Sequence, residues 1–223
     1  MMRQEPQYIT VNRRAYDELA SEYRERAGAD RIRDAKIIAP MATYLKERFG
    51  EGARILDIGP GNGVNLAMFQ ELGFRVSGID LSSRMIEVAR EFCPTADLRL
   101  GNFLTSPYSP ASFEGVFSKA SIHLFPKKDA VLVLRKVADI LVDNGMLYVT
   151  TTVSHAPNEA YSEKRDYLSS AVRYRKSWTP MELLKAIADA GLTVYAQGHN
   201  TEEDRCKHWF NVWATKTTSS TEK

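Results

Sequence analysis

Residues 55–66 read ILDIGPGNGVNL and place three glycines, one proline and two asparagines beside short apolar runs. The residues before Gly59 suit a buried β-strand, and the apolar pattern that resumes at Val64 suits an α-helix. Glycine, proline and asparagine are typical of tight turns, because they tolerate or preset backbone conformations that other residues avoid. The stretch therefore predicts a strand, a turn and a helix. At such a turn in a parallel sheet, main-chain amides and the helix N-terminus face the edge where ligands bind.

Strand-like and helix-like segments alternate on both sides of this turn. Alternation of this kind predicts an α/β fold with a parallel sheet and helices on both of its faces. The expected helices cover residues 12–26, 31–49, 62–73, 82–92, 128–141 and 179–191, and the expected strands cover residues 53–58, 74–80, 97–103, 112–120, 145–153, 192–198 and 207–216.

The composition is that of a soluble globular domain. The chain has 223 residues, of which 43% are hydrophobic and 26% charged, and its formal net charge is +2. This balance excludes a disordered chain and gives no reason to expect a nucleic-acid or membrane partner. The charged N-terminal residues lack the apolar core of a signal peptide, and no apolar run approaches the roughly 20 residues of a membrane span. Two cysteines are too few for a disulfide framework, so we expect a cytoplasmic, single-domain protein.

The turn does not match the usual phosphate-binding motifs. A dinucleotide fingerprint needs a glycine at the position of Val64, and a phosphate loop needs a lysine followed by serine or threonine. Asp57, just before the turn, would repel a pyrophosphate but attract an amino group. Asp80 ends the next expected strand 21 residues after Gly59 (80 − 59), the spacing at which a carboxylate binds ribose hydroxyls. A ribose that lacks phosphates and carries an ammonium-bearing group describes S-adenosylmethionine.

At these residues the sequence resembles the class I S-adenosylmethionine-dependent methyltransferases of the small, single-domain bacterial type. The family pattern of an acid followed by three alternate glycines is complete in Asp57, Gly59, Gly61 and Gly63. The likeness covers about residues 50–153. It implies a Rossmann-like seven-stranded sheet in the order 3-2-1-4-5-7-6, with the last strand antiparallel, helices on both faces and an N-terminal helical cap.

The resemblance implies which residues contact the cofactor. Asp80 matches the family's ribose-binding acid, and Asn102 stands where members commonly carry an aspartate that contacts adenine. An asparagine oxygen can still accept a hydrogen bond from the adenine amino group. Asn65 either contacts the cofactor's carboxylate or caps the helix, and Tyr16 and Tyr23 either close over the cofactor or only pack their helix. The expected cofactor contacts are Tyr16, Tyr23, Asp57, Gly59, Gly61, Asn65, Asp80, Leu81, Met85, Asn102, Phe103, Lys119 and Ser121.

The acceptor side rests on one histidine and one basic segment. His123 follows the fourth expected strand and is the candidate catalytic residue, which would orient or deprotonate the acceptor; the alternative is a histidine packed beneath the loop. Residues 154–177 lie where the family commonly inserts a substrate cover. Arginine offers a planar fork for a carboxylate or phosphate, so we expect a small acidic acceptor; the alternative is a solvated basic stretch. The expected substrate contacts are Tyr161, Lys164, Arg173, Arg175 and Trp178.

The sequence thus predicts methyl transfer from S-adenosylmethionine to an oxygen or nitrogen of a small metabolite, by a monomer or homodimer that needs no metal. Two alternatives stay open, because fold does not settle reaction. The first is an enzyme that uses the aminocarboxypropyl arm of the cofactor and releases methylthioadenosine. The second is a non-catalytic cofactor-binding module. The expected domain covers residues 1–216, with a helical cap at 1–49, the substrate cover at 154–177 and a disordered tail at 217–223.

Overall fold

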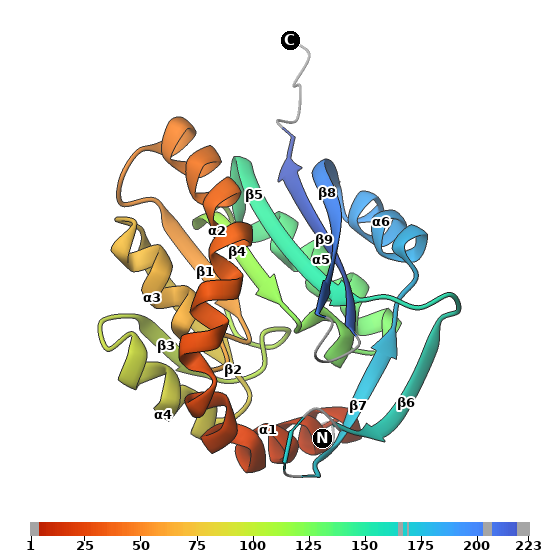
Figure 1. Cartoon of the computed structure of the whole chain (residues 1–223). Helices are drawn as coiled ribbons and strands as arrows, with labels where there is room; N and C mark the ends of the chain where they lie inside the picture. Colours follow the sequence, from red (N-terminus) through yellow and green to blue (C-terminus); the bar gives the residue numbers. More distant parts are fainter. Residues whose placement is uncertain (1–4, 165–166, 169, 203–206, 218–223) are drawn as a thin grey trace.

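A seven-stranded sheet forms the centre of the molecule (Figure 1). The computed structural model describes residues 5–164, 167, 168, 170–202 and 207–217. In spatial order the strands are β3 (Asp97–Leu100), β2 (Arg75–Asp80), β1 (Arg54–Ile58), β4 (Phe113–Lys119), β5 (Leu141–Thr152), β9 (Lys207–Lys216) and β8 (Leu192–Glu202). The first five are parallel, whereas β9 runs antiparallel to both β5 and β8. The predicted α/β class, strand order and reversed last strand are confirmed.

Helices bury both faces of the sheet, which explains why the strands read as nearly continuous apolar runs. Consecutive residues of β1 point to opposite faces, as the pleat requires. Ile55 packs in the cluster that contains residues of α2 (Ala27–Phe49), α3 (Val64–Glu71) and α4 (Ser83–Phe92). Leu56 packs in the cluster that contains residues of α5 (Lys127–Ile140) and α6 (Pro180–Asp189). The predicted helices on both faces are therefore confirmed.

Two parts of the chain differ from the sequence-based expectation. The first helix, α1, spans Gln7–Glu25, so it and α2 begin earlier than expected. Residues 154–177 contain two strands that were not expected, β6 (Asn158–Glu163) and β7 (Val172–Ser177), and these pair only with each other in an antiparallel hairpin. The hairpin lacks the usual alternation of apolar and polar residues, because β7 buries the charged side chains of Arg173 and Lys176. Hydrophobic periodicity therefore gave no strand signal here.

We call α1 together with the β6–β7 hairpin the cover, because both lie across the carboxyl ends of the parallel strands (Figure 1). The side chain of Asn12 joins the two parts. Its Nδ2 donates to the carbonyl oxygen of Leu124 at 3.0 Å, and its Oδ1 accepts the amide of Tyr174 at 2.8 Å. Asn12 is 2% exposed, so these bonds satisfy a polar group that would otherwise be costly to bury. The cover is thus tied both to itself and to the body of the domain.

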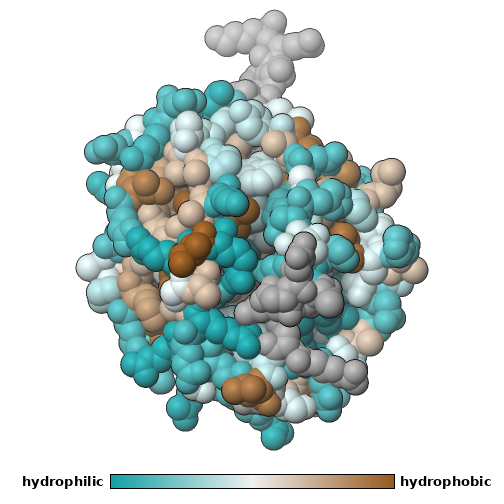
Figure 2. Space-filling model, viewed as in Figure 1, coloured by the Kyte–Doolittle hydropathy of each residue, from teal (hydrophilic) through white to brown (hydrophobic). Residues whose placement is uncertain are grey.

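The visible surface is mostly hydrophilic. On the face shown in Figure 2, apolar residues lie scattered among hydrophilic ones. Among the described residues, none of the helices combines the length and the apolar character that a bilayer crossing needs. The expected disordered tail lies outside the described residues, apart from Thr217.

Candidate functional site

The glycine-rich turn between β1 and α3 forms one wall of the site. Gly59, Gly61 and Gly63 have φ values of 76°, 57° and 77°, in the region that favours glycine. A Cβ on Gly63 would lie 2.7 Å from the Cα of Ala89 in α4. Gly63 therefore lets the turn lie close to α4. A Cβ on Gly59 would come within 3.2 Å of the Cβ of Ser121, so this glycine keeps the turn and the loop after β4 in contact.

A cavity of about 360 Å³ lies at the carboxyl ends of the parallel strands, between the turn and the cover. This volume lies within the usual range for small-molecule sites. The structure brings most of the predicted site residues to it, although the role of each stays a prediction. Those that line the cavity are Tyr16, Tyr23, Asp57, Gly59, Gly61, Asn65, Asp80, Leu81, Asn102, Phe103, Lys119, Ser121, His123, Lys164, Arg173 and Arg175.

Three predicted contacts lie outside the cavity. Met85 is fully buried in the packing between α1 and α4. Side chains of β7 alternate between the two faces of the hairpin, so Arg173 and Arg175 reach the cavity whereas Trp178, which continues the opposite series, packs in the core beside α6. Tyr161 pairs with Tyr174 of that same opposite series, and the two rings make an edge contact at 5.5 Å. The pleat of the hairpin accounts for both aromatic residues.

Two carboxylates stand at the anionic end of the cavity: Asp57 is fully buried and Asp80 is partly buried. Burial raises the pKa of Asp80 to about 6, although main-chain amides, including that of Ser82 at 2.9 Å, partly oppose the shift. Burial also raises the pKa of Asp57 well above its usual value, and the nearby charge of Asp80 adds to this. Asp57 Oδ1 has no hydrogen-bond partner among the described residues. A bound cation would relieve both carboxylates.

A group of ion pairs from α2 also borders the cavity, and sequence reasoning missed it. Asp34 pairs with Lys119, and Arg33 pairs with Asp30 and lies 3.2 Å from an oxygen of Glu202. These contacts join α2 to the ends of β4 and β8 beside the turn. A signal was present, since three charged residues at helical spacing share one face of α2, but such faces are usually solvated.

The asparagines at the site are held in different ways. The predicted alternative that Asn65 caps α3 is not what the structure shows: the N-cap residue is Gly63, and Asn65 Oδ1 has no partner among the described residues. Asn62 instead accepts the amide of Val64 at 3.3 Å and donates to the carbonyl oxygen of Tyr23 at 3.0 Å. Asn102 accepts the amide of Leu104 at 3.0 Å, which fixes its side chain beside the cavity.

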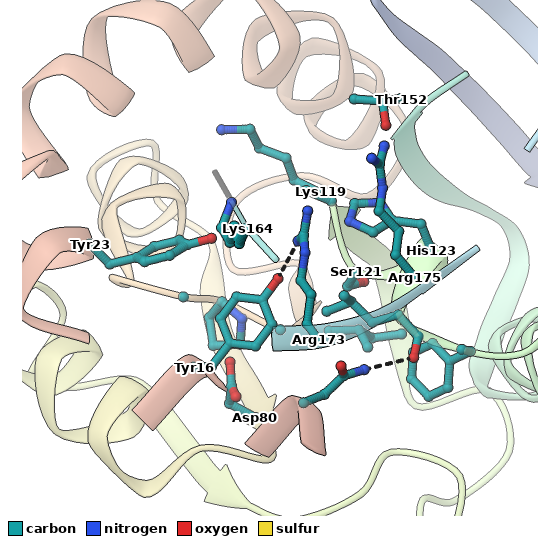
Figure 3. Close-up of a pocket in the computed structure, with 18 of the residues that line it drawn as sticks. Tyr16, Tyr23, Asp80, Lys119, Ser121, His123, Thr152, Lys164, Arg173 and Arg175 are labelled. Atoms are coloured by element: carbon teal, nitrogen blue, oxygen red, sulfur yellow. Dashed lines mark hydrogen bonds between the residues drawn. The ribbon is translucent and has the colours of Figure 1, made fainter. Parts of the chain in front are cut away.

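Aromatic rings of the cover face the turn. A Cβ on Gly61 would meet the ring of Tyr23 at 3.7 Å, so this ring lies directly over the turn. Tyr23 stacks on Tyr167, with ring centroids 4.9 Å apart and an interplanar angle of 12°. The hydroxyl of Tyr16 accepts a hydrogen bond from Arg173 at 2.9 Å, which Figure 3 shows as a dashed line. The two predicted tyrosines therefore connect the turn to the hairpin, and Tyr167 was not anticipated.

His123 lies at the opposite, cationic end of the cavity, beside Arg175 (Figure 3). It is 2% exposed, and its Nδ1 lies 3.0 Å from the hydroxyl oxygen of Thr151. Burial lowers the pKa of His123 well below its usual value, and surrounding cations lower it further. The cations responsible are Arg175, Arg173, Lys164 and Lys207. The imidazole is therefore neutral at neutral pH, and the positive charges around it would attract an anionic ligand.

Further cavity residues come from segments that carried no motif. They include Tyr8 and Asn12 of α1, and Thr152, Lys207, His208 and Trp209 at the facing ends of β5 and β9. Cys206, close in sequence to His208, lies outside the described residues. Within the described part of the chain, no three histidine, cysteine or acidic side chains come together as a metal site would require.

Known proteins resemble parts of this chain. Residues 55–145 match a family model described as a methyltransferase domain. A stretch of 105 residues is 30% identical to the ubiquinone biosynthesis O-methyltransferase of Xanthomonas campestris pv. campestris. That alignment covers 45% of this chain and 43% of the relative, so the chain spans less than half the length of the curated relatives it matches in this way. A stretch of 138 residues is 25% identical to the biotin biosynthesis bifunctional protein of Cellvibrio japonicus, covering 61% of this chain and 26% of that one.

The fold as a whole is shared with solved structures. The 1,6-didemethyltoxoflavin-N1-methyltransferase of Burkholderia thailandensis, solved with 1,6-didemethyltoxoflavin and S-adenosylhomocysteine bound, superposes with a TM-score of 0.69. The two proteins are 20% identical, and the match covers 96% of this chain and 93% of the other. Fold and site together define a Rossmann-like α/β protein with a ligand cavity at the carboxyl ends of its strands. The domain match gives the class of this region: residues 55–145 match a methyltransferase domain, as the resemblance read from the sequence predicted.

The residues at the turn fit S-adenosylmethionine, the cofactor that the resemblance implies. The ammonium of its amino-acid arm would satisfy the partnerless oxygen of Asp57, and buried polar groups are normally satisfied. Asn65 offers a second oxygen that has no partner among the described residues, and Asp80 offers a carboxylate for hydroxyl groups. Gly59 and Gly61 leave the main chain open to a ligand, since neither carries a side chain there.

Proposed function

We propose that the protein transfers the methyl group of S-adenosylmethionine to an oxygen or nitrogen atom of a small acidic metabolite. The observation that carries the proposal is the division of one cavity into an anionic end at the glycine turn and a cationic end around His123. A donor with a cationic amino-acid arm suits the first end, and an acceptor with a negative charge suits the second. One chamber that holds both brings the reacting atoms together.

At the anionic end, we propose that Asp57 binds the ammonium and Asp80 the ribose hydroxyls of the cofactor. The amide groups of the turn, opened by Gly59 and Gly61, would contact its amino-acid arm, with Asn65 beside them. Asn102 and Phe103 would border the base, because both line the cavity beyond the end of β3. In the same proposal, the tyrosines Tyr16 and Tyr23 of α1 close over the bound cofactor, and residues 1–49 act as its cap.

At the cationic end, we propose that Arg175 and Arg173 bind the anionic group of the acceptor and that His123 orients its nucleophile. When bound, the cofactor supplies an electrophilic methyl group on a sulfonium whose leaving group is neutral. As the nucleophile takes up that methyl group, its proton would leave through the hydrogen bond to His123 and pass to solvent. The chain contributes alignment, the exclusion of water by the cover, and a hydrogen-bonding nitrogen at His123.

The relatives support the chemistry in general terms. An O-methyltransferase and an N-methyltransferase are among the matched proteins, so methyl transfer is supported and both acceptor atoms stay within the proposal. Neither relative supplies the acceptor of this chain. The acidic character of the acceptor rests on the cations that line the cavity.

The by-product tests the reaction. We would incubate the purified chain with a metabolite extract and S-adenosylmethionine labelled on its methyl group, and analyse the mixture by mass spectrometry. S-adenosylhomocysteine together with a product that carries the labelled methyl group is the expected result. Methylthioadenosine would instead indicate transfer of the aminocarboxypropyl arm. Cofactor binding without any by-product would indicate a non-catalytic module.

A variant tests the acceptor end. Arg175→Met keeps the aliphatic stem and removes the charge, so we expect the KM for the acceptor to rise roughly tenfold or more, since a charge-assisted hydrogen bond is lost. The dissociation constant for S-adenosylhomocysteine, measured by calorimetry, should stay unchanged. Arg135→Met on the exposed side of α5 is the matched control. An unchanged KM would remove Arg175 from the proposal.

A further inference from the structure

We infer that Thr151 fixes His123 in the tautomer with its proton on Nδ1, so that Nε2 presents a lone pair to the cavity and accepts an O–H or N–H of the methyl acceptor. The inference rests on the proposed function and deepens it in two respects. It adds Thr151 as a positioning residue, and it narrows the acceptor to acids whose nucleophilic atom carries a hydrogen.

Two hydrogen bonds of one hydroxyl determine the tautomer. The hydroxyl of Thr151 lies 3.0 Å from His123 Nδ1 and donates to the carbonyl oxygen of Thr152 at 3.3 Å. A carbonyl oxygen can only accept, so it takes the single proton of the hydroxyl. The hydroxyl oxygen is then the acceptor toward the histidine, and Nδ1 must carry the donated proton. In the other tautomer, Nδ1 would have to accept the hydroxyl proton of Thr151, and the hydrogen bond to the carbonyl oxygen of Thr152 would be lost.

Both partners are held in place by the fold. Thr151 is fully buried in β5, where it pairs with Phe210 of β9. His123 belongs to the short 3-10 helix η1 (Ile122–Leu124), which Asn12 holds by its bond to the carbonyl oxygen of Leu124. Ser118 and Ser121, whose hydroxyl oxygens lie 2.6 Å apart, fix the loop that precedes it. The imidazole therefore has little freedom to turn away from Thr151.

The second ring nitrogen is left for a ligand. Within the part of the chain that the structure describes, Nε2 of His123 makes no hydrogen bond, and the residue lines the cavity. Figure 3 shows the imidazole beside the side chain of Arg175. Four cations act on the ring electrostatically: Arg175 and Arg173 of β7, Lys164 directly after β6, and Lys207 of β9. All four are donors only, so they can bind an anion but cannot accept a hydrogen bond from a nucleophile.

The class of acceptor follows from two features of this end of the cavity: cations that only donate hydrogen bonds, and the lone pair on Nε2 of His123. A carboxylate or phosphate meets the cations, while a hydroxyl, an amine with at least one hydrogen, or a ring N–H meets Nε2. The hydrogen bond points the nucleophile's proton toward the histidine and leaves its lone pair free for the methyl carbon. A tertiary amine or a thiolate offers no hydrogen to Nε2 and is not served by this arrangement.

The tautomer can be measured without any turnover. Long-range proton–nitrogen NMR on the uniformly labelled full chain separates the protonated from the unprotonated ring nitrogen of each of the 4 histidines. The His123→Gln variant identifies which signals belong to His123. We expect Nδ1 protonated and Nε2 unprotonated, unchanged between pH 6 and pH 8. A proton on Nε2 would overturn the inference, whatever the outcome of the by-product experiment.

Variants of the threonine link the tautomer to function. Thr151→Val removes the hydroxyl at nearly constant volume, and we expect it to mix the tautomers and lower kcat about tenfold, as for loss of one hydrogen bond, with cofactor affinity unchanged. Thr151→Ser keeps the hydroxyl and should retain the wild-type tautomer and the wild-type kcat. Thr150→Val is the matched control, because Thr150 is equally buried on the same strand and bonds the carbonyl oxygen of Phe210 instead.

Each outcome bears on the inference. A wild-type tautomer and kcat in Thr151→Val would contradict it, as would an equal loss in Thr150→Val. If Thr151→Val does not fold, the spectra of the wild type and of Thr151→Ser still decide the tautomer. A methylated product whose acceptor atom carried no hydrogen would overturn the acceptor class, while leaving methyl transfer itself intact.

Discussion

The two ends of the cavity are built in opposite ways. The anionic end comes from one compact stretch, the β1 turn, with Asp80 at the end of the neighbouring strand. The cationic end combines side chains from η1, β7 and β9, and these segments come together only through the cover and the antiparallel part of the sheet. A site built from one short stretch leaves a recognisable sequence motif. A site built from several distant segments leaves only single residues scattered along the sequence.

The electrostatics of the two ends are mirror images. At one end, burial and the nearby charge of Asp80 raise the pKa of Asp57; at the other, burial and nearby cations lower the pKa of His123. A ligand of opposite charge at either end would offset the shift there. Substitutions that act on one end and spare the other test whether the two are independent.

The largest effect is expected from Gly63→Ala, which distorts the backbone of the turn at the anionic end. The new Cβ would meet main-chain atoms of Ala89, the Cα at 2.7 Å, at a residue whose φ is +77°. Overpacking and left-handed strain together should lower the free energy of unfolding by about 3 kcal/mol. Denaturant titration measures the change. Gly198→Ala is the control: apart from its chain neighbours, no described residue has an atom within 4 Å of the position that its Cβ would take, so the substitution should be nearly neutral.

Asp80→Asn should come next, because it removes a charge and leaves the shape. We expect the affinity for S-adenosylhomocysteine to fall roughly 30-fold, or about 2 kcal/mol, as a charged hydrogen bond is weakened. Calorimetry gives this value, and the acceptor KM at saturating cofactor should change little. A larger effect on the acceptor than on the cofactor would show that the two ends are not separable.

Asp57→Asn should separate binding from stability. The amide removes a buried carboxylate whose charged form is disfavoured by burial and by Asp80, so the ligand-free protein should gain about 1 kcal/mol at pH 8. Cofactor affinity should decrease at the same time, because the ammonium loses its counter-charge. Thermal unfolding with and without S-adenosylhomocysteine measures both. A loss of stability in the ligand-free protein would contradict the strain attributed to this carboxylate.

The smallest effect is a pH dependence confined to the anionic end. Since the pKa of Asp80 is raised to about 6, cofactor affinity should fall about twofold at pH 6 relative to pH 8 as this carboxylate takes up a proton. Ligand-free stability runs the other way: a raised pKa contributes stability that is fully present below about pH 4 and is lost as the pH rises through 6. The pKa of His123 is lowered, so the acceptor KM should stay flat over the same range. Calorimetry and steady-state kinetics at matched ionic strength separate the two.

The predictable part of the fold and site is the part with a local signature. The alternation of strands and helices predicted the α/β class, and the family resemblance predicted the strand order. The turn, with Asp57 and Asp80, predicted the residues at one end of the cavity. His123 was found because it directly follows a strand that ends at the same edge. Arg173 and Arg175 were found from the density of cations in their segment, although the strand that presents them was not expected.

The remaining residues depend on facts that no single stretch contains. Tyr161 and Trp178 seemed equivalent to their basic neighbours until the pleat of the hairpin placed them on its other face. Thr151 reads as an ordinary buried strand residue, and its bond to His123 exists only because β5 passes beside η1. Asp34 and Glu202 reach the site through ion pairs between distant elements. Such contacts follow from tertiary packing rather than from pattern.

The two hydrogen bonds made by the Asn12 side chain have a kinetic consequence. One amide side chain binds α1 to both β7 and η1. The part of the cover above the turn and the part near His123 therefore cannot open separately unless one of these hydrogen bonds breaks. Entry of the acceptor and departure of the spent nucleoside then pass through the same opening event. Steady-state kinetics should show a compulsory order of binding, with the spent nucleoside leaving last and acting as a tight competitor of the methyl donor.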